Sequence, residues 1–271
     1  MAMTPSGYWR PSDGPTAIQD LTEDILKKLY VNHSNSEQRL PTVFSTWTVS
    51  WAAMMRYAAS LQCESNEIYV SVLDTKKLLQ KTDNGNDSVN LVLLTSDPGL
   101  FAASGVGHRY RFLVFGVIPG STFTTKMMAD LEQAADMRRV QTLDGSMAGW
   151  RMPWVGDRTM LMEKQLQIVQ RLGNLFGTSL ELAVMCHVAE ATLDKFLKMD
   201  TGVDKLAERL MGKCSGVPDD WSADPAYSRL DVNRLCARIP GSSVTAMVDK
   251  GDVKKAVSII AAIEAILGGE A

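Results

Sequence analysis

The sequence predicts an α+β fold in which a strand-rich N-terminal part precedes an all-helical C-terminal part. Short runs of β-branched and aromatic residues recur up to about residue 125, and such residues favour the half-buried surface of a sheet. Beyond that point, apolar residues recur at three- and four-residue steps, as in helices with one buried face. We therefore predict an α+β domain over residues 1–125 and a helical domain over residues 126–271.

In the N-terminal part, the segment from Leu40 to Asp74 is expected to form a strand, a helix and a second strand. Its helix is indicated by Trp51, Met54 and Ala58, which share one face at helical spacing. We expect this unit to pair with the strand over 110–118, which is the strongest strand signal in the chain. The elements predicted for this part are helices over 16–30 and 51–61, and strands over 43–46, 67–74, 89–94 and 110–118.

In the C-terminal part, the apolar residues of the helix over 179–199 cover more of its surface than one narrow stripe. It is therefore expected to lie at the centre of its domain or against a partner. Its acids, Glu181, Glu190 and Asp194, are interpreted as a solvated face. The segment 143–157, rich in Gly and Trp, is predicted to be a loop. The other expected helices span 127–140, 160–176, 203–211, 229–238 and 252–267.

The composition excludes several classes of function. With 271 residues, 45% of them hydrophobic and 22% charged, the chain is an ordinary globular protein. Its net charge of −3 gives no sign of the basic surface that nucleic-acid binding normally needs. We find no secretory signal and no apolar run long enough to span a membrane. The 4 cysteines lack metal or disulfide spacing and fit a reducing compartment, so an intracellular, cytoplasmic protein without a metal site is expected.

Four short segments carry a resemblance to a known fold. An aromatic pair precedes Arg10, and Pro41-Thr42-Val43-Phe44-Ser45 then stands before the predicted helix. Val72-Leu73-Asp74-Thr75 follows, and Phe112 to Pro119 reads FLVFGVIP. In this order the segments resemble the ADP-ribosyltransferase-like fold. They are most similar to a group of fungal proteins of unknown function, and the resemblance covers about residues 8–123.

The resemblance implies a split β-sandwich with a cleft for NAD. It implies that Arg10 pairs with a phosphate of NAD, for which a guanidinium is well shaped. Ser45 and Thr46 would then brace the cleft beside the nicotinamide ribose. The family's glutamate, which stabilises the cationic ribose as nicotinamide leaves, falls where this chain has Arg111. These four residues are our candidates for cofactor binding.

Two functions follow from these positions. A guanidinium beside a developing cation is repulsive, so we expect a non-catalytic structural or interaction protein on a degenerate fold, a pseudoenzyme that needs no cofactor. The fungal resemblance suggests its setting, the surface or assembly of a fungal virus particle. The alternative is an active NAD-dependent ADP-ribosyltransferase or NAD glycohydrolase that uses Arg10 and Ser45 with a relocated acid, namely Glu64, Glu67 or Asp74.

Partner binding is expected through the helical half. Trp150, Trp154 and Trp221 stand in segments rich in Gly and Pro, and exposed loop aromatics are typical anchors of protein interfaces. The 15 methionines supply adaptable contact surfaces in addition. We therefore predict protein partners or self-assembly into an oligomer.

Overall fold

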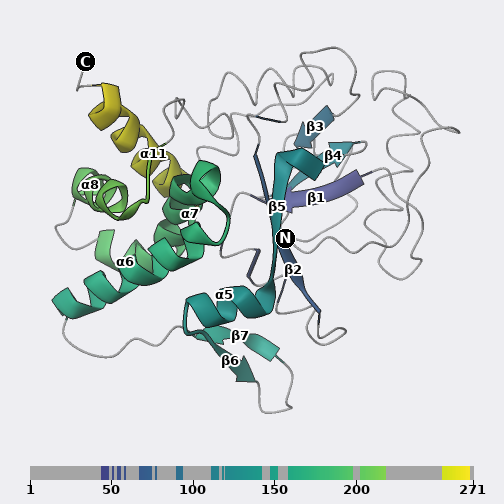
Figure 1. The fold of residues 1–271 in the computed structure, drawn as a ribbon, viewed down its shortest axis with the longest axis horizontal. Helices are drawn as coiled ribbons and strands as arrows, with labels where there is room; N and C mark the ends of the chain where they lie inside the picture. Colours follow the sequence, from purple (N-terminus) through teal and green to yellow (C-terminus); the bar gives the residue numbers. More distant parts are fainter. Residues whose placement is uncertain are drawn as a thin grey trace, which may run out of the picture.

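The computed structural model describes residues 44–48, 51, 54–55, 58, 67–74, 77, 90–93, 111–115, 118, 120–141, 147–151, 158–197, 202–217 and 252–268. Within these residues the chain has a mixed α+β fold that is rich in helices, as predicted at this level (Figure 1). The strands are β1 (Phe44–Thr48), β2 (Tyr69–Leu73), β3 (Asn90–Leu93), β4 (Arg111–Phe115), β5 (Phe123–Met127), β6 (Arg138–Gln141) and β7 (Met147–Arg151). The helices are α5 (Met128–Ala134), α6 (Arg158–Asn174), α7 (Thr178–Leu197), α8 (Val203–Lys213) and α11 (Asp252–Gly268), with a 3-10 turn, η3, over Gly120–Thr122.

The predicted unit of strand, helix and strand is confirmed where it is described. Trp51, Met54 and Ala58 lie between β1 and β2 in the sequence, and all three are helical and buried. The predicted pairing is confirmed as well, because β1 pairs with β4 in an antiparallel register. The other edge of β4 pairs with β3, so the sheet has the strand order β1-β4-β3. The predicted helices over 16–30 and 229–238 lie outside the described residues.

A second antiparallel pair, β2 with β5, forms a two-stranded ribbon. Ser71 lies opposite Thr125 in the register, and their hydroxyls are 2.7 Å apart in a hydrogen bond. At one end of the ribbon, Phe123 packs against the core with its ring 6.5 Å from that of Trp47. The predicted domain boundary after residue 125 falls inside β5, and the division into two domains stays a prediction.

The segment after β5 corrects two predictions. The helix expected over 127–140 ends at Ala134, because Asp136 adopts the left-handed conformation with φ 49° and turns the chain. The loop expected over 143–157 contains β7, which pairs with β6 as an antiparallel hairpin. The part of the chain beyond residue 125 is therefore not all-helical, because β5, β6 and β7 extend into it.

The four long helices confirm the remaining predictions within about two residues at most ends. Gly177, with φ +86°, turns the chain between α6 and α7, a conformation that glycine adopts without steric cost. Helix α7 contacts α6, α8 and α11, so the prediction of a central helix is confirmed. Figure 1 shows α6, α7, α8 and α11 on the left and the sheets β1-β4-β3 and β2-β5 to their right.

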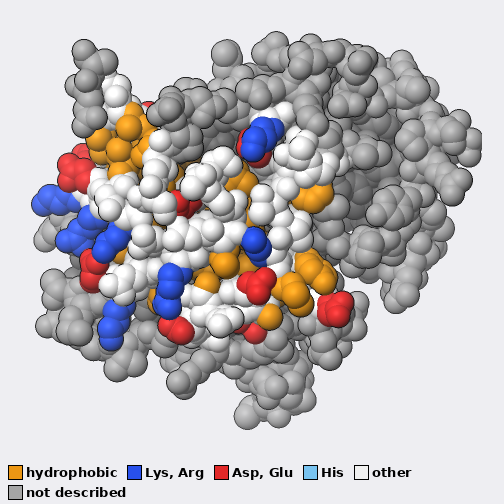
Figure 2. Space-filling view, viewed as in Figure 1, with side chains coloured by type: hydrophobic (Ala, Val, Ile, Leu, Met, Phe, Trp, Pro, Cys, Tyr) orange, Lys and Arg blue, Asp and Glu red, His pale blue; other side chains and the backbone are white. Residues whose placement is uncertain are grey.

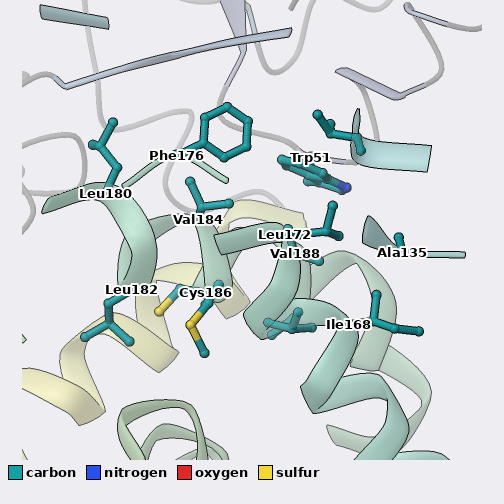
Figure 3. Packing of buried hydrophobic residues seen from close by; sticks show 14 of the residues in the cluster. Trp51, Ala135, Ile168, Leu172, Phe176, Leu180, Leu182, Val184, Cys186 and Val188 are labelled. Carbon is teal, nitrogen blue, oxygen red and sulfur yellow. The ribbon is translucent and has the colours of Figure 1, made fainter. Parts of the chain in front are cut away.

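One hydrophobic cluster links the helices to the strand-rich part. Trp47 and Trp51 from the N-terminal part belong to the same buried cluster as Leu172 of α6 and Val188 of α7. Figure 3 shows Trp51 at the level of these two helices, next to Leu172 and Val188. Burial of a large apolar side chain contributes about 1.5–3 kcal/mol, so this shared core stabilises both parts together.

Candidate functional site

The residues predicted to bind NAD lie on the paired strands β1 and β4. Ser45 stands opposite Val114, Thr46 opposite Leu113, and Thr48 opposite Arg111. Because residues directly opposite share a face and successive residues alternate, Thr46 and Arg111 share one face of the sheet and Ser45 lies on the other. The register therefore brings two of the candidates to one face and separates the third.

Arg111 is also distant from Ser45 along the ladder. The two positions are three register steps apart, or roughly 10 Å at about 3.4 Å per residue. Ser45 shares its face with Trp47, which is buried with 6% of its surface exposed. The fourth candidate, Arg10, lies outside the described residues.

One proposed substitute acid, Asp74, has structural partners. Its Oδ1 accepts a hydrogen bond of 3.0 Å from the backbone N–H of Lys77, as an N-cap carboxylate does. Its Oδ2 lies 3.2 Å from Lys77 Nζ, and its own N–H donates to the carbonyl of Thr122. Glu67 is exposed ahead of β2, and Glu64 lies outside the described residues. The geometry thus gives Asp74 the contacts of a helix cap.

A buried carboxylate in the helical part was not expected. Glu181 in the first turn of α7 has only 1% of its surface exposed, so its interpretation as part of a solvated face is wrong. Its Oε1 accepts hydrogen bonds from the backbone N–H of Ser215 at 3.0 Å and from the Ser215 hydroxyl at 3.1 Å. Buried charges require such partners. The pairing fixes the segment after α8 against the start of α7.

The close approach of α6 to α7 at this point depends on Gly173. A Cβ atom there would lie 2.9 Å from the carbonyl oxygen of Glu181 and 2.6 Å from Cγ of Met185. Both distances are shorter than real Cβ contacts. Glycine therefore lets the two helix backbones approach beside the buried carboxylate.

Cys214 lies beside this pair but has the wrong chemistry for a nucleophile. Its thiol donates a hydrogen bond of 3.1 Å to the carbonyl of Gly216. Burial raises the pKa of the Cys214 thiol above its ordinary value of 9.0, and the carboxylate of Glu181 raises that pKa further. The thiolate is the reactive form of cysteine, so the raised pKa lowers the reactivity of this thiol at neutral pH. The cluster of Glu181, Cys214 and Ser215 is a structural junction.

The three tryptophans predicted to lie in loops are only partly described. Trp150 lies in β7 opposite Arg139, so its prediction as a loop residue is wrong, and Trp154 and Trp221 lie outside the described residues. Among the described residues, no three His, Cys, Asp or Glu side chains form a group that could hold a metal ion. In the same part of the chain, no helix has both the length and the apolar character needed to cross a membrane.

Comparison with known proteins adds no relative. No protein-family model, no curated protein and no solved structure matches the chain.

Proposed function

We propose that the protein is a non-catalytic structural or interaction protein built on a degenerate ADP-ribosyltransferase-like fold. Two separate antiparallel sheets, β1-β4-β3 and β2-β5, suit a split sandwich. The observation that carries the proposal is the position of Arg111 as the first residue of β4, on the face that it shares with Thr46. A cation at the place of the family's glutamate repels the positive charge that develops on the ribose.

The separation of Ser45 from that face supports the same proposal. A working cleft needs its bracing residues and its charge-stabilising residue around one reacting atom, within hydrogen-bond reach. Here Ser45 and Arg111 lie on opposite faces, roughly 10 Å apart along the ladder. Asp74, a substitute acid of the alternative enzyme, is bound to Lys77.

The experiment combines a calorimetric titration of the full chain with NAD and an assay for released nicotinamide. We expect no turnover. The Arg111→Glu variant restores an acid at this position and tests whether the missing charge alone prevents the reaction, with Arg209→Glu on the exposed side of α8 as the matched charge reversal. Nicotinamide release by the unmodified chain, abolished by Arg10→Ala, would instead establish the NAD-consuming enzyme.

The proposed role in assembly has its own measurement. If the chain is a surface or assembly protein of a fungal virus particle, the purified protein forms a defined species larger than one chain, and it sediments with particles from infected cells. A protein that stays in the soluble fraction when such particles are pelleted contradicts this setting, while the nicotinamide assay still decides between pseudoenzyme and enzyme.

A further inference from the structure

We draw no further inference here: the strongest candidate, the surface patch formed by the exposed apolar pair Tyr69 and Met127 at the end of the β2–β5 ribbon, carries nothing, because hydrophobic, acidic and basic side chains are intermixed among the described residues in Figure 2 and nothing in the structure shows what covers the pair.

Discussion

The helical part and the β2–β5 ribbon differ in how far their side chains are buried. In the helical part, even the carboxylate of Glu181 is buried, and Ser215 supplies it with two hydrogen bonds. In the ribbon, Tyr69 and Met127 lie opposite each other and remain exposed. A buried region contributes mainly stability, whereas apolar groups left in solvent contribute little to it. The difference predicts that the helical part contributes more to stability than the exposed end of the ribbon does.

The most direct way to break this comparison is to truncate one side chain from each region. Leu172 is completely buried, so Leu172→Ala should lower the free energy of unfolding by about 2–5 kcal/mol through lost contacts and a cavity. Tyr69→Ala removes an exposed ring and should change that free energy by about 0.5 kcal/mol or less. Urea denaturation followed by tryptophan fluorescence measures both. Equal losses would show that the ribbon end is part of the stabilising core.

A second prediction concerns how closely the helices pack. Gly173→Ala places a methyl group against the carbonyl of Glu181 and Met185, so we expect a loss of about 1–3 kcal/mol. Gly212→Ala is the matched control, because it lies in helix α8 with open space around its Cβ position. The control should gain up to about 1 kcal/mol, since alanine loses less conformational freedom in a helix. Thermal unfolding of the two variants in parallel should shift in opposite directions.

A third prediction tests the buried carboxylate. Glu181→Ala leaves the N–H of Ser215 without its acceptor, and we expect a loss of about 1–3 kcal/mol. Glu181→Gln keeps one oxygen that can accept this hydrogen bond, so it should lose less. Hydrogen exchange at the Ser215 amide gives a local readout, with faster exchange expected in the alanine variant. If Glu181→Ala unfolds at the same urea concentration as the unmodified chain, the junction does not contribute to stability.

The sequence predicted the long helices well because helical periodicity is local. Each turn of α6, α7 and α8 carries its own apolar positions, and packing then confirms them. The strand β5 was missed because its partner is not local, whereas β6 and β7 pair with each other as a hairpin and were missed because RRVQ and MAGWR are not typical strand sequences. Thr125 pairs with Ser71, 54 residues earlier, and short runs such as FTTKM contain no strong alternation of apolar and polar residues. Whether such segments form strands depends on the strand with which they pair.

The candidate site shows the same limit. The sequence placed Ser45 and Thr46 on a strand, but adjacent strand residues point to opposite faces, and only the register with β4 shows which one shares a face with Arg111. Glu181 was assigned to solvent because it is an acid, although Leu180, Leu182 and Val184 surround it in sequence. That apolar context was the available signal. Its partner, Ser215, is 34 residues away in the sequence and lies just after the end of α8.

The smallest expected effect concerns the pKa of one thiol in the helical part, that of Cys214. Since burial raises the pKa of Cys214 in the folded chain, the thiol remains protonated at a pH where it ionises in the unfolded chain. The stability linked to this group is therefore fully present below its ordinary pKa of 9.0 and is lost as the pH rises through the higher pKa of the folded state. Alkylation by iodoacetamide under native conditions should accordingly have its midpoint above pH 9.0.

Glu181→Gln removes the negative charge beside the thiol, so it should shift this midpoint to lower pH. Cys186 is fully buried in α7 and serves as the internal reference, because it should stay unmodified while the chain is folded. A Cys214 midpoint below pH 9.0 would contradict the effect of burial, and a midpoint that Glu181→Gln leaves in place would mean that the carboxylate does not act on the thiol. Cys214 would then be more accessible to solvent than expected for a thiol in the buried helical part, because an accessible thiol behaves like a surface group.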